Sequence, residues 1–394
     1  MTSPTIHQSS PFTRAVVNSM RKLYPEALAD KSFDNTGLLL EAPFYPSRRQ
    51  NNSVLLTIDL TQAVAEEAIE RKDSVVVAYH PIIFRGLKSL TLSDPQQQSL
   101  LRLALEGISV YSPHTAVDAA PGGVNDWLCD IVTGKLSEPE PETKTANVSG
   151  ASSTAFQSAS SQLDDPFTEE SPEPPSENQQ PIKRNYSRPT YPIAPAEWDQ
   201  TDLHPSSADH TRCVIQPAAE IEGFEGAGYG RIVTFTDPQP LTHLIERVAR
   251  GVGTPKGFPV AIPQNKQVED MSIKTVGICA GSGGSILRDL DVDLLFTGEL
   301  SHHEALAATE KGQAVITLFH SNTERGFLNS VLREQLESEL REQWQDVREE
   351  EEGNEEWDEA LNDGDVSVEV SERDRDPYGI VVLQDCIHDE EKKK

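Results

Sequence analysis

The stretch VLLTIDLTQAVAEEAIERKDSVVVAYH, residues 54–80, decides the fold of this chain. An apolar run opens it, a helical segment follows, and a second apolar run closes it. The helical segment carries its apolar side chains on one side, namely Val64, Ala65, Ala68 and Ile69. GISVYS (107–112) repeats the strand pattern further along the chain. Strands separated by helices of this length favour a parallel sheet with helices on its faces.

The composition indicates that part of the chain does not join a hydrophobic core. Of the 394 residues, 36% are hydrophobic and 27 are prolines, and the mean hydropathy is -0.48. The 64 acidic residues outnumber the 34 basic ones, which gives a net charge of -30. Because an acidic surface repels phosphate backbones and anionic lipid headgroups, we expect neither nucleic-acid binding nor membrane binding.

Cysteine usage favours a reducing compartment. The four cysteines are far apart and form no CxxC pair, which argues against a disulfide scaffold and against a thiolate zinc site. They are Cys129, Cys213, Cys279 and Cys386. The chain contains no run of about 18 apolar residues, so we expect no membrane-spanning helix.

The N-terminal segment has the pattern of an amphipathic helix, because its apolar side chains recur at helical spacing from Phe12 to Leu23. The same segment has no acidic residue before Glu26 and carries three basic ones, Arg14, Arg21 and Lys22. These features are also compatible with a mitochondrial presequence. We therefore expect a cytoplasmic protein, with a mitochondrial location as the alternative.

Residues 136–205 interrupt the alternation of helices and strands. Proline, serine and glutamate dominate there and no apolar period survives, so we expect a disordered insertion. Ordered patterns resume near Cys213. They predict strands over 228–235, 274–281, 291–299 and 314–319, and helices over 241–253, 301–312 and 321–341. The acidic tract at about 346–366 is expected to be a solvated loop.

Histidines and carboxylates follow three of the predicted strands. His80 comes directly after SVVVAY, His114 opens the string HTAVD that contains Asp118, and His320 ends AVITLF four residues before Glu324. The carboxyl ends of strands in an α/β sheet are where ligands bind, and an i, i+4 pair shares a helix face. Any one of these histidines could be a polar residue satisfied in a loop. Three strand ends of this kind together favour a divalent-metal site with imidazole and carboxylate ligands.

Four other features have both a functional and a structural interpretation. His302 and His303 start a helix that Ser301 would cap, and they face either a cavity or solvent. AGSGGS (280–285) could cradle a phosphate, although a tight turn is the stronger interpretation. Asp34 and Asn35 are expected to cap and turn the chain. Arg85 and Lys88, just after the metal strand, are the nearby basic side chains that could meet an anionic substrate.

Six strings that occur in order carry a specific resemblance to a known family. They are SFDNTGLLL (32–40), YHPIIFRGLKSL (79–90), YSPHTAVDAAPGGVNDWL (111–128), GICAGSGGS (277–285), FTGELSHHEAL (296–306) and FHSNTERGFL (319–328). Together they closely resemble the Nif-three-like family, which is named for an Ngg-one-interacting factor and also labelled GTP cyclohydrolase I type 2 homologues. The resemblance implies two interlinked α/β lobes, with mixed sheets flanked by helices, in a subunit of a ring-shaped homohexamer.

The resemblance also implies how the lobes divide the sequence. Residues 11–135 would form the first part of lobe I, with metal motifs, and 210–312 would form lobe II. Residues 313–385 would return to lobe I and bring the His/Glu motif, with the acidic loop at about 346–366. The disordered insertion at 136–205 would lie between the lobes in the sequence.

Carried over position by position, the resemblance implies a dinuclear metal site in each subunit. Its ligands would be His80, Asp118, His320 and Glu324, with Glu324 bridging the ions. Tyr79 departs from the pattern, because many bacterial members have a histidine there, and a neutral phenol is a poor ligand. We therefore expect one or two divalent ions per subunit, of the zinc, iron, manganese, cobalt or nickel class. His80, Asp118 and Glu324 would serve the first ion, and His320 with Glu324 a second, weaker one.

Two functions follow from this site. The first is a metal-dependent hydrolase acting on a nucleotide or phosphoester-like substrate, with His114 or His303 moving the proton. The second is a non-catalytic metal-binding protein that regulates or interacts with a protein partner, such as a transcription cofactor. Converging ionisable ligands favour the hydrolase, and the biased insertion and acidic tract favour the partner.

Overall fold

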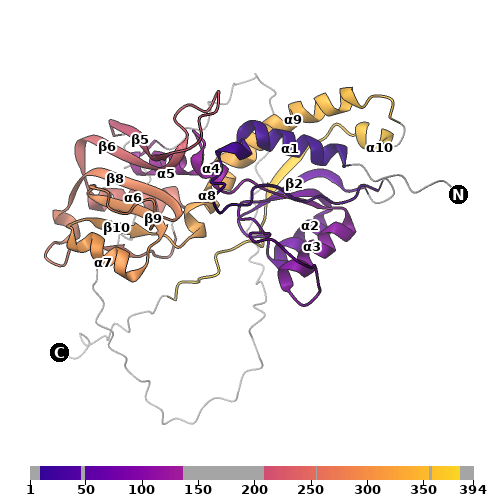
Figure 1. Cartoon of the computed structure of the whole chain (residues 1–394). Helices are drawn as coiled ribbons and strands as arrows, with labels where there is room; N and C mark the ends of the chain where they lie inside the picture. The colour runs from indigo at the N-terminus through magenta and orange to yellow at the C-terminus, as the bar shows by residue number, and fades with distance from the viewer. Residues whose placement is uncertain (1–8, 46–48, 136–207, 254, 355–356, 382–394) are drawn as a thin grey trace, which may run out of the picture. The chain divides into compact units, whose positions relative to one another are not determined.

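The computed structural model describes residues 9–45, 49–135, 208–253, 255–354 and 357–381, which Figure 1 shows in colour. The insertion predicted at 136–205 lies outside these residues. The described part folds into two mixed sheets flanked by helices, which confirms the predicted fold class. No helix within it is long and apolar enough to cross a bilayer.

The first sheet has the strand order β1-β4-β3-β2-β11. Its strands are β1 (Gly37–Leu40), β2 (Asn51–Thr57), β3 (Asp73–Ala78), β4 (Ser109–Ser112) and β11 (Ser367–Val370). β11, β2, β3 and β4 run parallel, as the strand-helix alternation predicts, and β1 joins β4 antiparallel.

Helices cover both faces of the first sheet. Helices α1 (Pro11–Leu23) and α9 (Arg333–Glu350) pack on one face, and α2 (Gln62–Arg71) and α3 (Pro95–Glu106) on the other (Figure 1). Successive side chains of a strand point to opposite faces. In β2, Leu56 therefore joins the core that contains Phe12 of α1, whereas Leu55 joins the cluster that contains Leu103 of α3. Burial on both faces explains why the strands read as continuous apolar runs.

The second sheet has the strand order β5-β6-β8-β9-β10-β7. Its strands are β5 (His210–Pro217), β6 (Gly228–Pro240), β7 (Val260–Ala261), β8 (Ser272–Ser282), β9 (Leu294–Glu299) and β10 (Ala314–Thr317). β8, β9 and β10 run parallel, and the remaining pairs are antiparallel. One face packs on α5 (Val124–Thr133) and α6 (Leu241–Gly251), and the other on α7 (His302–Glu310).

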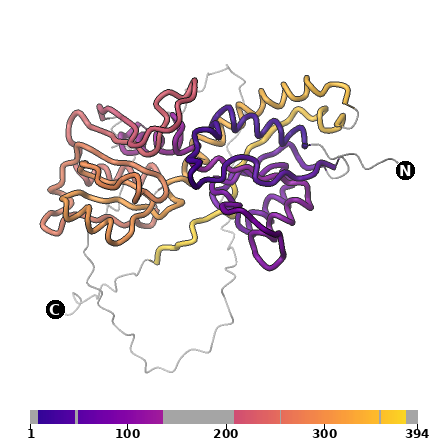
Figure 2. Tube along the Cα trace, in the orientation of Figure 1, coloured from indigo at the N-terminus to yellow at the C-terminus, as the bar shows by residue number. Residues whose placement is uncertain are grey.

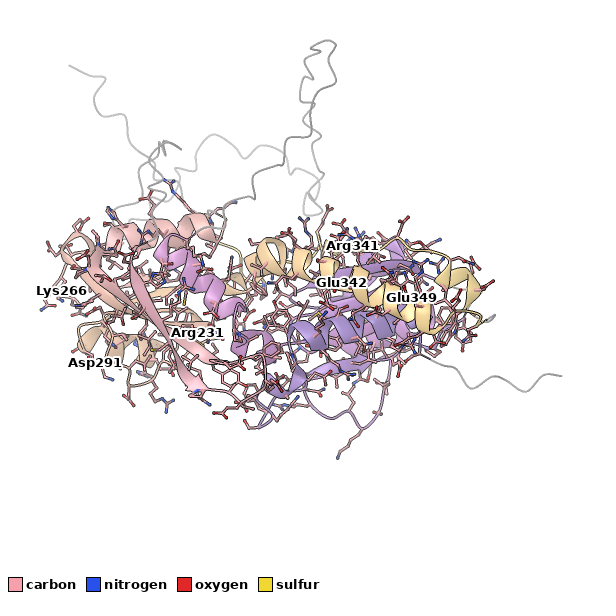
Figure 3. All side chains as sticks on the ribbon, turned by 90° about the horizontal axis from the view of Figure 1, so that it is seen from above. Arg231, Lys266, Asp291, Arg341, Glu342 and Glu349 are labelled. Atoms are coloured by element: carbon pink, nitrogen blue, oxygen red, sulfur yellow. The ribbon has the colours of Figure 1, made fainter. Side chains whose placement is uncertain are left out.

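The chain crosses from one sheet to the other. Helices α4 (Thr115–Ala119) and α5 follow β4 of the first sheet but pack against the second, as the purple trace in Figure 2 shows. The buried guanidinium of Arg231 on β6, labelled in Figure 3, donates two hydrogen bonds to Asp126 of α5, at 2.9 and 3.0 Å. The side chain of Asn125 accepts from the backbone N–H of Ala280 at 2.9 Å and donates to the carbonyl of Asp118 at 3.0 Å. These polar contacts hold α4 and α5 to the second sheet.

The boundary implied between residues 312 and 313 is wrong. β10 pairs with β9 and β7, so the chain returns to the first sheet only after Thr317. The single helix predicted from Ser321 to Arg341 is also wrong. It is replaced by a short 3₁₀ turn (Ser321–Thr323), α8 (Arg325–Phe327), a π-helical turn (Leu328–Leu332) and α9. A Cβ at Gly326 would lie 2.7 Å from the ring of Trp127, so this glycine permits the close packing there.

The solvated acidic loop predicted at about 346–366 is replaced by packed helices. α9 continues to Glu350, and after a turn α10 (Asp358–Leu361) follows. Most acidic side chains of this tract face solvent, as Figure 3 shows for Glu349 on α9. Apolar residues of the tract are buried, including Val347, Trp357 and Leu361. Two further 3₁₀ turns, Glu26–Leu28 and Val268–Asp270, complete the described elements.

Candidate metal centre

His80 lies just beyond the end of β3. Its backbone N–H donates to the carbonyl of Ile58 at 3.0 Å, so the chain continues beside the end of β2. The Nδ1 atom of its ring lies 2.9 Å from the Oδ1 atom of Asp59, which follows β2. A histidine whose Nδ1–H donates to a carboxylate presents its Nε2 lone pair in a fixed direction. Neighbouring parallel strands therefore provide both the imidazole and the group that orients it.

His320 is held in the same way in the second sheet. It follows β10, and its Nδ1 atom lies 2.9 Å from the Oε1 atom of Glu299, the last residue of β9. The preceding residue, Phe319, has a φ angle of +66°, which is strained for a bulky side chain. Two histidines from the two sheets thus share one arrangement, in which a carboxylate orients the ring and leaves Nε2 available.

Glu324 connects the two histidines. Its Oε2 atom lies 3.2 Å from Nε2 of His80, and its Oε1 atom lies 3.6 Å from Nε2 of His320. The ligand atoms of these three residues all lie within 4.8 Å of one another, so the cluster could hold a metal ion. Nε2 of His80 and Oε2 of Glu324 are buried and face each other, but neither makes a hydrogen bond of good geometry within the described part of the chain. Buried polar atoms without a hydrogen bond are rare, and these two fit the donor set of a divalent transition metal.

The electrostatic environment of the cluster favours a cation. Burial alone would lower the pKa of His80, but the negative charges of Glu324 and Asp59 outweigh burial and raise the pKa to about 10. Surroundings that stabilise a proton on His80 also stabilise a metal ion at that position. The donor set and the electrostatics therefore agree.

Asp118 and Tyr79 make a pair beside the cluster. The Tyr79 hydroxyl donates to Oδ1 of Asp118, and the carboxylate of Asp118 is not part of the three-residue cluster. Burial raises the pKa of Asp118 to about 6. Burial and the nearby carboxylates of Asp118 and Glu324 also raise the pKa of Tyr79 well above its usual value, so this phenol stays neutral. Asp118 lines the same cavity as His80, His320 and Glu324, and its expected role as a ligand beside His80 and Glu324 stays a prediction.

Of the two candidate proton-transfer residues, one lies at the site. His114 lines the same cavity as His80, and their ring centroids are 5.5 Å apart. Nδ1 of His114 lies 2.7 Å from Oδ1 of Asp34, and the other oxygen of Asp34 accepts from Thr115. His303 is exposed on α7 and is absent from the residues that line the cavity. The structure therefore brings His114 to the cluster and leaves His303 at the surface, in the first turn of the helix that Ser301 caps.

The cluster opens into a cavity of about 890 Å³. Six carboxylates line it, from Asp30, Asp59, Asp118, Glu299, Glu324 and Asp376. Its described lining contains three histidines but no lysine or arginine. Arg85 and Lys88 are exposed and do not contribute, so the structure does not support their expected role.

The glycine-rich string at 280–285 contacts the segment from His320 to Glu324. The N–H of Gly281 donates to Oγ1 of Thr323 at 2.8 Å, and its carbonyl accepts from Thr297 at 3.1 Å. Its φ angle is +61°, and a Cβ there would lie 2.8 Å from Oε1 of Glu324. Residues 280–282 end β8, and the N–H groups of Ala280 and Gly281 are already bonded to Asn125 and Thr323, so neither of these two is available to a phosphate.

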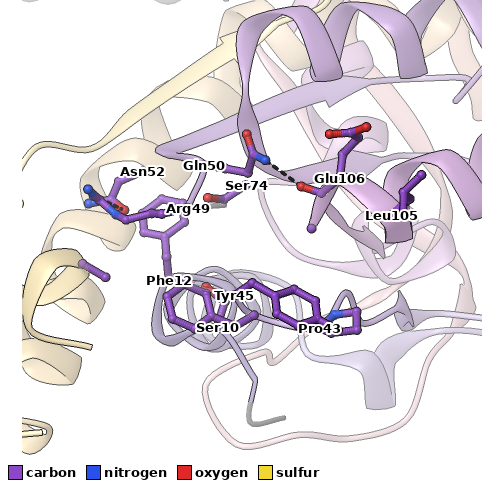
Figure 4. A pocket seen from close by; sticks show the side chains of 13 residues that line it. Ser10, Phe12, Pro43, Tyr45, Arg49, Gln50, Asn52, Ser74, Leu105 and Glu106 are labelled. Atoms are coloured by element: carbon purple, nitrogen blue, oxygen red, sulfur yellow. Dashed lines mark hydrogen bonds between the residues drawn. The ribbon is translucent and has the colours of Figure 1, made fainter. Parts of the chain in front are cut away.

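A second pocket, shown in Figure 4, is too small for a ligand. It holds about 20 Å³, close to the space of one water molecule. Gln50 crosses it and donates to the carbonyl of Glu106 at 2.6 Å. The large cavity at the cluster is therefore the better candidate site within the described residues.

Sequence reasoning missed two functional side chains, Asp59 and Glu299. Each directly follows an apolar strand, VLLTI or LLFTG, at the same sheet edge as a histidine. The rule that singles out His80 and His320 applies equally to these carboxylates, so the signal was present. Asp34 was assigned to capping, and its contact with His114 needs the folded chain.

Comparisons with known proteins identify the family. The family model for Duf34/NIF3 (NGG1p interacting factor 3) matches residues 13–349. A NIF3 homolog of Schizosaccharomyces pombe is 41% identical, over 81% of this chain and 87% of the relative. NGG1-interacting factor 3 of Saccharomyces cerevisiae is 35% identical over 82% and 90%, and NIF3-like protein 1 of Homo sapiens is 31% identical over 93% and 92%.

Solved structures with a similar fold include proteins of the same family. A Bacillus cereus protein related to NIF3 aligns with a TM-score of 0.55 at 18% identity, over 93% of this chain and 98% of that one. A Staphylococcus aureus protein also aligns with a TM-score of 0.55, over 94% and 100% at 17% identity. Identities this low support the shared fold alone. Together with the close yeast relatives, they lead to one conclusion: the chain belongs to the Duf34/NIF3 family.

Proposed function

We propose that this protein is a divalent-metal-dependent hydrolase. The observation that carries the proposal is the cluster of His80, His320 and Glu324, in which both histidines are oriented by carboxylates and face one cavity. A bound divalent ion supplies Lewis acidity, which polarises a substrate oxygen and makes water a better nucleophile at neutral pH. A scaffold without chemistry has little physical need for this arrangement.

His114 is the candidate for proton transfer. Asp34 occupies its Nδ1 atom, so Nε2 is the atom that remains to accept or donate a proton. An imidazole held by one ring nitrogen, with the other turned toward the site, suits a general acid or base. The Tyr79 hydroxyl and Asp118 lie beside it and complete a polar wall next to the ion.

The first measurement is the metal content of the purified full chain by elemental analysis. The geometry predicts about one zinc, iron, manganese, cobalt or nickel ion per chain. The second is hydrolysis of a panel of phosphoesters, nucleotides and cyclic amides, with and without a chelator. We expect Glu324→Gln to lose both metal and activity, and His114→Gln to keep metal but lose about 100-fold to 10,000-fold in rate.

Matched variants separate chemistry from folding. Glu342→Gln and His302→Gln make the same changes at exposed positions outside the cavity, and they should behave like the unmodified protein. A hydrolase at this site would be ruled out if the unmodified protein bound metal at the expected ratio and both Glu324→Gln and His114→Gln hydrolysed the panel at its rate.

A second candidate function is a regulatory role with a protein partner. It is favoured by the name of the yeast relative, NGG1-interacting factor 3. Under this alternative, Glu324→Gln would change partner binding and no hydrolysis would be found. The ring-shaped homohexamer implied by the resemblance is likewise a proposal, which light scattering on the full chain would test.

A further inference from the structure

Aromatic rings surround the cavity in two pairs. Phe33 and Phe84 have ring centroids 6.2 Å apart, and Phe84 also lies 6.3 Å from the ring of His114. Phe319 and Tyr378 are stacked, with centroids 6.0 Å apart and an interplanar angle of 30°. All four line the cavity, and Phe33, Phe84 and Tyr378 are 54%, 45% and 70% exposed. Large apolar rings left open at a cavity, rather than packed in a core, indicate a binding surface.

The Phe319–Tyr378 pair is held in place from both sides. Phe319, whose backbone is strained, directly precedes His320 in the sequence. Strain of this kind concentrates at functional sites, because the surrounding structure must maintain it. It gives the pair a fixed position relative to the metal ligands.

Tyr378 ends an extended segment, residues 371–378, that we call the strap. Its side chains bond to four parts of the chain: Ser371 to Glu67 of α2, Asp374 to the N–H of Ile58 after β2 and to Arg325 of α8, and Asp376 to Ser321 of the 3₁₀ turn. Asp376 also accepts from the backbone N–H of Tyr378 at 2.8 Å. Because Ser321 adjoins His320, the strap positions Tyr378 beside the metal cluster.

The charge of the cavity limits what these rings can receive. Six carboxylates and no lysine or arginine occur among its described lining residues. A triphosphate carries several negative charges, and one divalent ion does not compensate for both the phosphates and the carboxylates. Proteins that bind phosphates often use arginine or lysine side chains, which the described lining lacks. The N–H groups of Ala280 and Gly281 in the lining are already bonded to Asn125 and Thr323.

We propose that the cavity binds a planar heteroaromatic ring, uncharged or cationic and without phosphate groups. The ring would stack on Tyr378 or Phe84, with its reacting group toward His80, His320 and Glu324. Stacking on an aromatic face suits any planar base, and a cationic ring gains further attraction from the face of Tyr or Phe and from the carboxylates. The inference deepens the proposed function by naming its substrate class, and it rests on that function only for what happens to the ring after binding.

The test measures binding to the zinc-loaded full chain by calorimetry. The probes are adenosine, guanosine, cytidine and nicotinamide, compared with ATP, GTP, CTP and ribose 5-phosphate. We expect at least one ring to bind ten or more times as tightly as its triphosphate and as ribose 5-phosphate. Zinc content after each titration shows whether a triphosphate has removed the ion.

Substitutions identify the surface. Tyr378→Ala and Phe84→Ala should each weaken ring binding about tenfold and leave the zinc content unchanged. Tyr378→Phe keeps the ring and should bind like the unmodified protein. Leu92→Ala is a matched control, because Leu92 is 71% exposed and lies outside the cavity lining.

Two results would overturn the inference. One is that the triphosphates bind as tightly as the rings, or that no ring of the panel binds at millimolar concentration. The other is ring binding that neither alanine variant weakens. The proposed hydrolase is judged separately. A ring that binds as expected but is never hydrolysed contradicts the hydrolase alone. Phosphoester hydrolysis at a rate that neither Tyr378→Ala nor Phe84→Ala changes contradicts this inference alone.

Discussion

Tyr79 sits where the resemblance leads one to expect a histidine, and its chemistry limits the metal centre. The phenol is buried and neutral, and its hydroxyl donates a hydrogen bond to Asp118 instead of offering a lone pair to a metal. Asp118 is thereby engaged beside the cluster, not within it. His80, His320 and Glu324 form the group that could hold an ion.

Replacing this phenol should change the metal stoichiometry. In Tyr79→His, an imidazole beside Asp118 and Glu324 would supply the ligand that a second ion lacks. We expect elemental analysis to give about two ions per chain, compared with about one in the unmodified protein. Tyr79→Phe is the control and should keep one ion, since it removes the bond to Asp118 without adding a ligand. A value of one in Tyr79→His would show that the phenol does not limit the site.

The contact between Asp34 and His114 predicts a pH-dependent contribution to stability. Burial alone would raise the pKa of Asp34, but the bonds from His114 and Thr115 outweigh burial and lower it below 3.8. A carboxylate with a lowered pKa stabilises the fold above its ordinary pKa, and this contribution is lost as the pH falls through the lowered value. Asp34→Asn should therefore cost about 1–3 kcal/mol of unfolding free energy at pH 7.

Thermal unfolding across a pH series checks this expectation. The difference in Tm between the two proteins should be largest at neutral pH and shrink as the pH falls below about 4. Asp291→Asn, at an exposed position labelled in Figure 3, is the control and should show no such trend. A difference that stays constant with pH would mean that the charge of Asp34 contributes nothing.

The C-terminal end of β8 positions two residues of the candidate metal cluster through a glycine. Gly281 has a φ angle of +61°, and a Cβ there would lie 2.8 Å from Oε1 of Glu324 and 2.9 Å from Nε2 of His320. No larger residue can occupy this position without moving the ligand atoms. The strand end is therefore part of the metal centre even though it contributes no ligand.

Gly281→Ala tests this role. We expect metal affinity to fall at least tenfold and the unfolding free energy to fall by about 1–3 kcal/mol, because strain and a steric clash act together. Zinc titration and thermal unfolding measure the two effects. Gly86→Ala is the matched control, since a Cβ there meets nothing within 4 Å and its φ angle is not positive. Equal zinc affinity in the two variants would contradict the steric argument.

The elements also show what the sequence can and cannot reveal. Apolar runs such as 54–60 predict the strands, because burial on both faces leaves a continuous apolar signal. The same rule places His80 and His320 at strand ends, and it could have found Asp59 and Glu299. The membership of β10 in the second sheet depends on pairing with β9, which no local pattern encodes. The acidic tract was predicted wrongly for a related reason. Its charges dominate the composition, whereas a few buried apolar residues between them, such as Val347, Trp357 and Leu361, determine the packing.

At the scale of the whole molecule, the cluster joins distant parts of the chain. His80 comes from the first sheet, and His320 and Glu324 follow the last strand of the second. A bound ion therefore acts as a crosslink between residue 80 and residues 320–324. Any ligand that binds only the folded chain stabilises it by mass action.

Removing the metal should lower the stability of the fold. With free zinc at 100 times its Kd, the expected gain is about 2.7 kcal/mol, and chelation should remove it. In thermal unfolding this corresponds to a decrease in Tm of a few degrees. Glu324→Gln should unfold at the same temperature with and without chelator. A chelator effect of equal size in that variant would place the stabilising ion elsewhere.

The strap has a consequence for inference between relatives. The family match ends at residue 349, whereas the strap begins at residue 371. The region that the family model matches thus contains all three cluster residues but omits the wall that Tyr378 provides. Two chains can agree at every metal ligand and still differ at this wall. A substrate identified for one relative is therefore a poor guide to another until the residues after the last strand have been compared.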